Sequence, residues 1–117
     1  TNQSGIARKI FGHLDVKKLH DFLDKFLLNK KDAKIDDYFY CPHHPTEGFG
    51  VYKKSCYCRK PRPGMIKAAI KKWSISKKTS FMIGDQYTDY QSALSSNIKF
   101  HYKKKNSLFT QIKKIIN

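Results

Sequence analysis

The sequence predicts an α/β fold in which a mostly parallel sheet is layered with helices. Two observations lead to this prediction. Segments with helical periodicity alternate with short apolar runs of strand length, and one such run, TSFMIGD, ends in Gly-Asp. We expect the 117 residues to form one domain, 1–117, because a chain of this length can bury a single core. Ligands of such sheets bind beyond the carboxyl ends of the strands.

The first half of the chain is predicted to hold one helix, one strand and a long loop. Residues 15–29 carry apolar side chains at helical spacing, and Asp15 is placed to cap this helix. Residues 34–41 are rich in aromatic side chains, which favours a short strand. Residues 42–62 show neither pattern and are expected to form an irregular loop.

The second half is predicted to alternate regularly between helix and strand. Pro63 opens its first helix, with Met65 facing inward, and Thr88 is a possible cap for its second. The predicted elements are a helix at 63–73, a strand at 79–85, a helix at 88–96, a strand at 97–102 and a helix at 107–117.

The net charge of +15 comes from 24 basic and 9 acidic side chains and favours anionic partners. Phosphorylated small molecules, nucleic acid and membrane surfaces all belong to that class. The lysines are spread along the chain in pairs, so we expect most of them on solvent-exposed faces. No apolar run is long enough to span a bilayer, so no membrane span is expected. Among these anionic partners a small phosphorylated molecule is predicted, and a membrane is not.

All three cysteines lie in the segment 41–58. An odd number speaks against a disulfide framework, and Cys56 and Cys58 are too close in sequence to bridge without strain. We therefore expect a reducing, cytoplasmic setting in which the thiols are free or bind a metal.

Two ligand pairs in this segment predict a metal site. Cys41-x-His43 and Cys56-x-Cys58 offer three thiolates and one imidazole, which suit tetrahedral Zn²⁺. Four protein ligands leave no open position, so the zinc would be structural and would order the loop 41–58. His44 could replace His43 as the fourth ligand, and the spacing does not decide between them.

Three further patterns suit phosphate. Residues 1–5, TNQSG, offer hydroxyl and amide groups, and Arg59 with Lys60 follow the cysteines as a guanidinium fork and a point charge. Asp85 ends an apolar run, where it could hold Mg²⁺, and Asp89 follows one helical turn later. Taken singly, the three patterns are also those of a turn, a solvated pair and a helix cap.

Taken together, these motifs resemble those of the haloacid dehalogenase phosphatase superfamily. More closely, they resemble the D-glycero-D-manno-heptose 1,7-bisphosphate 7-phosphatases, with the histidinol-phosphate phosphatases as neighbours. The twelve residues between the two ligand pairs favour the heptose branch. The resemblance implies a Rossmann-like three-layer α/β/α fold with an inserted zinc-binding loop. The motifs, in order, are TNQSGIAR, CPHHP, SCYCRKPRPGM and FMIGDQYTDYQSA.

The resemblance implies substrate-binding roles for four residues. The hydroxyl of Thr1 would bind the transferring phosphoryl group, Asn2 would orient it, and Arg59 would contact a substrate phosphate. Lys60 would act both in substrate binding and in catalysis, by offsetting charge on the phosphate and on the nucleophile. The family's zinc ligands match Cys41, His43, Cys56 and Cys58.

The resemblance also implies a catalytic Mg²⁺, held by Asp85 with Asp89 as a supporting carboxylate. Gln86 departs from the family, which commonly has a basic residue at this position. Charge stabilisation beside Asp85 is therefore in doubt.

The family's nucleophile is the first aspartate of a D-x-D motif, which forms an aspartyl-phosphate, and the second aspartate is its acid and base. No two aspartates stand two residues apart in this sequence. We therefore expect the C-terminal portion of a longer enzyme, or a split or decayed copy, with the N-terminal strands missing. We expect it to be inactive alone and either poorly stable or self-associating, whereas the intact enzyme is expected to be a monomer.

The predicted function is thus a magnesium-dependent phosphatase acting on a sugar phosphate, in heptose activation for lipopolysaccharide or glycoprotein. Histidinol-phosphate phosphatase is the alternative within this chemistry. An alternative of another class is a zinc-clipped nucleic-acid-binding module, favoured by aromatic residues among the lysines of 52–60 and 100–105. A degenerate homologue with a purely structural role is a third.

Overall fold

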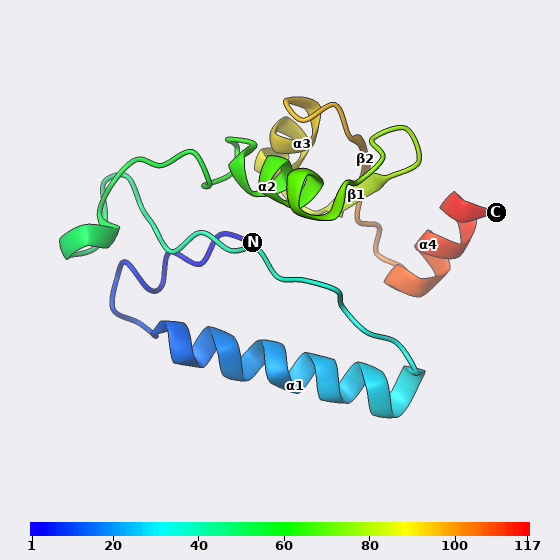
Figure 1. Ribbon diagram of the computed structural model, residues 1–117, viewed down its shortest axis with the longest axis horizontal. Coiled ribbons are helices and arrows are strands. Elements are labelled where there is room, and N and C mark those ends of the chain that lie inside the picture. Colours follow the sequence, from blue (N-terminus) through cyan, green and yellow to red (C-terminus); the bar gives the residue numbers. More distant parts are fainter. The chain divides into compact units, whose positions relative to one another are not determined.

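In the computed structural model, which describes residues 1–117, the chain forms two compact units, Thr1–Arg59 and Lys60–Asn117. None of the helices has the length and apolar character needed to cross a lipid bilayer. The first unit contains α1 (His13–Lys31) and the short 3₁₀-helix η1 (Gly50–Tyr52). The second contains α2 (Gly64–Trp73), β1 (Phe81–Gly84), α3 (Tyr87–Leu94), β2 (Lys99–Tyr102) and α4 (Leu108–Ile116) (Figure 1).

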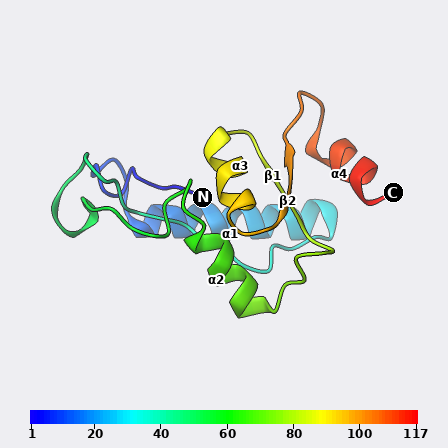
Figure 2. The same ribbon diagram turned by 90° about the horizontal axis from the view of Figure 1, so that it is seen from above.

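The second unit is built on a two-stranded parallel sheet. β1 and β2 pair from Phe81 opposite Lys99 to Gly84 opposite Tyr102. Figures 1 and 2 show α3 as the connection between the two strands, and α3 packs against both of them. The predicted parallel pairing and the α/β alternation are therefore confirmed. The helix–strand order places the ends of both strands, and whatever follows them, at one edge of the sheet.

Serine hydroxyls fasten α3 to its neighbours within the second unit. Ser92 is buried and its hydroxyl donates a hydrogen bond to the backbone oxygen of Arg62, 3.2 Å away. The hydroxyl of Ser96 donates to the backbone oxygen of Ser92 at 2.9 Å. The apolar core beside these serines is small, so their hydrogen bonds supplement it. Its buried members are Met65, Ala93 and Ile98.

In the first unit, α1 begins at His13, two residues before the predicted cap. Gly12 is the N-cap, and Asp15 lies in the first turn, where its carboxylate accepts the Gly12 N–H at 2.8 Å. The prediction of Asp15 as the cap is therefore wrong. The physical reason is a capping box, in which the acidic residue three positions into the helix bonds back to the cap.

The segment after α1 returns in the opposite direction and packs against that helix (Figure 1). The Tyr38 ring stacks on His20 with centroids 3.8 Å apart, and its hydroxyl donates to Asp24 at 2.8 Å. Burial, together with the Asp24 carboxylate, raises the pKa of Tyr38 to about 12. The aromatic side chains of this segment therefore hold it against α1.

The predicted strand at 34–41 is not formed as a regular strand. Pairing is limited to one parallel bridge between Asn2 and Cys41, where the Cys41 N–H bonds Thr1 O at 2.9 Å and the Gln3 N–H bonds Cys41 O at 2.7 Å. A strand exists only where a neighbour completes its ladder, and local sequence carries no information about that neighbour.

The loop after Cys41 is irregular apart from η1, and a glycine fastens it. Gly48 has φ +102°, and a Cβ there would lie 2.4 Å from the backbone oxygen of Ala7. The next residue, Phe49, donates its N–H to that same oxygen at 2.9 Å. Only glycine allows both the backbone conformation and the close approach, so the tip of the loop is anchored to the segment before α1.

Candidate functional site

The loop from Cys41 to Cys58 gathers four metal-ligand side chains in the first unit. The ligand atoms of Cys41, His43, Cys56 and Cys58 all lie within 4.8 Å of one another. The three sulfurs are 3.0–3.3 Å apart, and His43 Nδ1 lies 3.6 Å from Cys41 Sγ and 3.5 Å from Cys58 Sγ. The Cys-x-His and Cys-x-Cys pairs, far apart in sequence, therefore converge on one point.

His43, and not His44, faces the sulfurs. The Nδ1 of His44 instead accepts the backbone N–H groups of Thr46 at 3.3 Å and Glu47 at 2.9 Å. His44 thus caps a turn of the loop, because its ring nitrogen satisfies two backbone donors that would otherwise lack a partner. The two histidines, equivalent by spacing, have different positions in the fold.

The donor set and its protonation fit a tetrahedral thiophilic ion. Thiolates bound to zinc at about 2.3 Å stand about 3.8 Å apart at the corners of a tetrahedron, so the distances between the sulfurs would increase by about 0.5–0.8 Å when zinc binds. Burial, followed by the charge of Lys54, lowers the pKa of His43, which favours the neutral imidazole that a metal requires.

The pKa values of the three thiols shift in different directions. Burial raises the pKa values of Cys41 and Cys58. Burial also acts to raise the pKa of Cys56, but hydrogen bonds from Cys58 and Cys41 outweigh it, and the net shift is downward. Neighbouring thiolates repel one another, which opposes the deprotonation of all three thiols in this part-buried site. A bound divalent cation would offset that repulsion.

The predicted phosphate-binding residues of the first unit lie around this cluster. Arg59 follows the last ligand, and its Nη1 donates to the backbone oxygen of His43 at 3.2 Å. Asn2 forms the bridge to Cys41, and the Thr1 hydroxyl lies 3.5 Å from Asn2 O. The ligand loop therefore fixes the guanidinium of Arg59, and the bridge fixes the backbone that carries Thr1 and Asn2.

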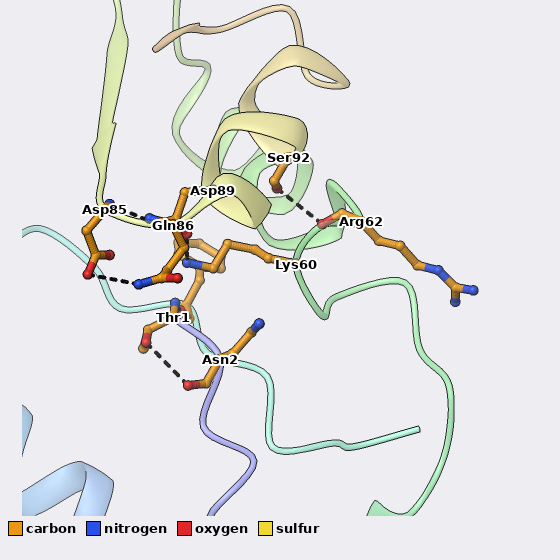
Figure 3. A network of polar contacts seen from close by, with 9 residues as sticks. Thr1, Asn2, Lys60, Arg62, Asp85, Gln86, Asp89 and Ser92 are labelled. Atoms are coloured by element: carbon orange, nitrogen blue, oxygen red, sulfur yellow. Dashed lines mark hydrogen bonds and ion pairs between the residues drawn. The ribbon is translucent and has the colours of Figure 1, made fainter. Parts of the chain in front are cut away.

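The second unit holds an ion pair between Lys60 and Asp89, which are 29 residues apart (Figure 3). Lys60 Nζ bonds Asp89 Oδ1, and the side chains are only 16% and 5% exposed. Asp89 Oδ2 also accepts the backbone N–H groups of Asp85 at 3.2 Å and Gln86 at 3.1 Å. Asp89 is thus the buried centre of the turn that leads from β1 into α3.

Opposing effects act on Asp89. Burial raises its pKa, but the bond from Lys60 and the N–H groups of Gln86 and Asp85 more than reverse this, and the net shift is downward. Asp89 is therefore held as a carboxylate. Gln86, not Thr88, is the N-cap of α3, so the predicted cap is wrong for the same reason as in α1.

Asp85 is exposed and stands directly after the carboxyl end of β1. In the turn, Gln86 Nε2 donates a hydrogen bond to Asp85 Oδ2 at 3.4 Å. The residue that departs from the family's basic type thus supplies a neutral amide donor. An exposed carboxylate at a strand end is the kind of group that binds Mg²⁺ together with water.

Gly84 makes room for the buried carboxylate. A Cβ at Gly84 would lie 2.6 Å from both Cβ and Oδ2 of Asp89. We expect Gly84→Ala to destabilise the second unit by about 1–3 kcal/mol through overpacking, measured by urea unfolding of Trp73 fluorescence. Gly12→Ala is a control for the added methyl group, since its Cβ would meet Asp15 Oδ2 at an ordinary 3.8 Å; its unfolding is followed by circular dichroism, because Gly12 lies in the first unit. Equal stability of the Gly84 variant and the parent would show that the turn is not packed as described.

Sequence reasoning missed the contacts between His13 and two tyrosines. His13 Nδ1 lies 2.8 Å from the Tyr40 hydroxyl, and His13 Nε2 lies 3.0 Å from the Tyr52 hydroxyl. Tyr40 immediately precedes Cys41 in the sequence, which is a signal of proximity to the ligands. Nothing in the sequence links His13 to either tyrosine.

Comparison with known proteins places these motifs in a family context. A family model described as HAD-hydrolase-like matches residues 57–102. The chain is 46% identical over 98 residues to the D-glycero-beta-D-manno-heptose-1,7-bisphosphate 7-phosphatase of Photorhabdus laumondii, covering 84% of this chain and 52% of that protein. The proteins of the same name are 44% identical in Pasteurella multocida (85% and 53% covered) and 39% identical in Escherichia coli K12 (84% and 51%). The chain spans about half the length of these relatives.

Two solved structures are similar as well. A HAD-like phosphatase from Mesorhizobium loti matches with a TM-score of 0.76 at 30% identity, over 84% of this chain and 46% of that one. The D,D-heptose 1,7-bisphosphate phosphatase of B. bronchiseptica, complexed with magnesium and phosphate, matches with a TM-score of 0.70 at 30% identity, over 86% and 51%. At 30% identity, both likenesses rest on sequence as well as on fold.

Proposed function

We propose that the chain belongs to the haloacid dehalogenase-like hydrolases and is part of a phosphatase that removes the 7-phosphate of D-glycero-β-D-manno-heptose 1,7-bisphosphate; the family model over residues 57–102 and the similarity to the heptose phosphatases support this. The observation that carries this proposal is the turn after β1, where exposed Asp85 stands beside the buried Lys60–Asp89 pair. That turn combines a carboxylate that could hold a metal ion with a fixed cation, two of the components that stabilise charge in phosphoryl transfer. The choice of sugar follows from the names of the relatives.

In this proposal, the second unit supplies charge neutralisation. Asp85 would hold Mg²⁺, which when bound supplies Lewis-acid stabilisation of charge on the phosphoryl oxygens. Lys60 is held by Asp89 and keeps its ammonium in place, so its charge is available without reorganisation. Asp89 supports both, because its two oxygens bind Lys60 and the backbone of Asp85.

The first unit would position the substrate phosphate. We assign the phosphoryl contact to the Thr1 hydroxyl, its orientation to Asn2, and a second phosphate contact to Arg59. Arg59 suits this role because its bond to His43 O leaves further guanidinium N–H groups to donate.

We assign Zn²⁺ to the cluster of Cys41, His43, Cys56 and Cys58. The four donor atoms and the neutral imidazole support this, and a closed set of four ligands leaves no position for substrate. The zinc would be structural, and it would fix the loop that ends at Arg59.

We expect the 117-residue chain by itself to release no phosphate from the heptose bisphosphate. The chemistry needs a nucleophilic aspartate and a general acid two residues apart, and the sequence holds no such pair. The assay is phosphate release in the presence of Mg²⁺, with histidinol phosphate in parallel. Turnover of either substrate by this chain would overturn the expectation.

The substrate is tested in a chimera that joins a D-x-D segment of this family ahead of Thr1. We expect release of the 7-phosphate only, and its loss in the matched chimera carrying Asp85→Asn. Preference for histidinol phosphate would favour the alternative substrate. A folded chimera that turns over neither compound would contradict the proposal.

A further inference from the structure

His13, the first residue of α1, lies between two tyrosine hydroxyls. Its Nδ1 is 2.8 Å from Tyr40 Oη and its Nε2 is 3.0 Å from Tyr52 Oη. A neutral imidazole can donate to one hydroxyl and accept from the other, whereas an imidazolium can donate to both. In each protonation state both ring nitrogens therefore keep a partner, and the ring is held in one orientation.

The two tyrosines are attached to the ligand cluster through different parts of the chain. Tyr40 is covalently joined to Cys41. Tyr52 belongs to η1, and its backbone oxygen accepts the N–H of His44 at 3.1 Å, directly beside the ligand His43. The Tyr52 ring also lies 6.1 Å, centroid to centroid, from the ring of His43. A displacement of either tyrosine would therefore be transmitted to a ligand.

We propose that His13 is a positioning residue of the metal loop, acting through Tyr40 and Tyr52. The inference rests on the proposed zinc site and extends it to a helix that contributes no ligand. Four ligands from a long loop lose less conformational entropy on binding when the loop is already held. Hydrogen-bond partners behind the ligands typically change metal affinity by about 10–100-fold.

His13 does more than pack α1 against the returning segment. That packing already has its own contacts farther along the helix, in the stacked His20 and Tyr38 rings and the bond from Tyr38 to Asp24. The bond from His13 to Tyr52 instead joins the start of α1 to the ligand loop. The two sets of contacts can therefore be separated by mutation.

The test measures the dissociation constant for Zn²⁺ by competition with a chromophoric chelator, using the full 117-residue chain. The variants are His13→Ala, which removes both hydrogen bonds, and Tyr52→Phe, which removes one hydroxyl and keeps the ring. Tyr38→Phe is the matched control, because it removes a hydroxyl bonded to α1 outside this set. Co²⁺ absorption, which is sensitive to ligand type and geometry, is recorded for each.

We expect zinc to bind about tenfold more weakly to His13→Ala, and by a smaller factor to Tyr52→Phe, with Tyr38→Phe unchanged. The double variant should bind no more weakly than His13→Ala alone, since both changes break the same bond. The Co²⁺ spectrum should keep its three-thiolate form in all variants. His13→Gln, which retains a donor and an acceptor, should recover part of the lost affinity.

The outcomes separate the two proposals. If the parent chain binds no zinc, the zinc site itself is wrong, and this inference with it. If the parent binds zinc and both His13→Ala and Tyr52→Phe bind it equally well, only the positioning role is wrong. If Tyr38→Phe weakens zinc binding as much as Tyr52→Phe does, the effect comes from general packing of α1, and the positioning role is overturned. If His13→Ala fails to fold, Tyr52→Phe decides.

Discussion

Replacing Asp89 with Ala is expected to destabilise the second unit by about 3–5 kcal/mol. The change removes the carboxylate from an ammonium that is only 16% exposed and withdraws an acceptor from two backbone N–H groups. Removing one partner of a buried ion pair costs more free energy than the intact pair contributes to stability, because the remaining charge stays buried without a partner.

Trp73 allows the unfolding of the second unit to be measured separately. It is the single tryptophan of the chain and lies in α2, so urea unfolding followed by its fluorescence reports on the second unit. Asp85→Ala is the matched control in the same unit, because Asp85 is an exposed aspartate of the same turn, and a substitution at such a site typically changes stability by less than about 0.5 kcal/mol. Similar urea midpoints for the two variants would show that the Lys60–Asp89 pair is not buried in solution.

Replacing Cys58 with Ser is expected to weaken zinc binding about 100-fold and to lower the stability of the first unit. Structural zinc sites contribute about 10–16 kcal/mol of binding free energy, so one of four ligands is worth on the order of 3 kcal/mol. Because a hundredfold change corresponds to about 2.8 kcal/mol, the two magnitudes agree. The loop should then release Arg59, which is bonded to His43 O.

The prediction is checked by chelator competition and by the rate at which the thiols react with a maleimide. Removing zinc from the parent chain with a chelator should speed that reaction and loosen the loop. Asp85→Asn serves as the control, since it should weaken Mg²⁺ binding and leave zinc and thiol reactivity unchanged. If the loop stays ordered and the thiols stay protected without zinc, the metal is not what holds the loop.

The elements of the second unit were predictable because their signals are local. Helical periodicity in 63–73 and apolar runs at 79–85 and 97–102 report burial on one face, and the structure places α2, β1 and β2 within those ranges. The strand predicted at 34–41 is not formed, because the aromatic pattern on which the prediction rested has another cause. Its aromatic side chains contact α1, and its backbone pairs only with the residues around Asn2.

Helix caps show a second limit. Asp15 and Thr88 are residues of cap type, yet the caps are Gly12 and Gln86. In both helices the aspartate three residues after the cap accepts a hydrogen bond from the backbone N–H of the cap residue. Sequence identifies the region of a helix start, whereas the hydrogen bonds that close the first turn decide the residue.

The sequence alone determined the chemical inventory: three thiols and an imidazole in two pairs, a guanidinium followed by an ammonium, and a carboxylate after an apolar strand. These groups could be identified from the sequence because the type and spacing of ligand residues do not depend on how the chain folds. The tertiary structure decided which groups meet. In the fold, His43 and not His44 lies beside the sulfurs. Lys60 binds Asp89, which is 29 residues away, and His13 lies between Tyr40 and Tyr52. Such contacts depend on how distant segments pack, and local sequence does not encode that packing.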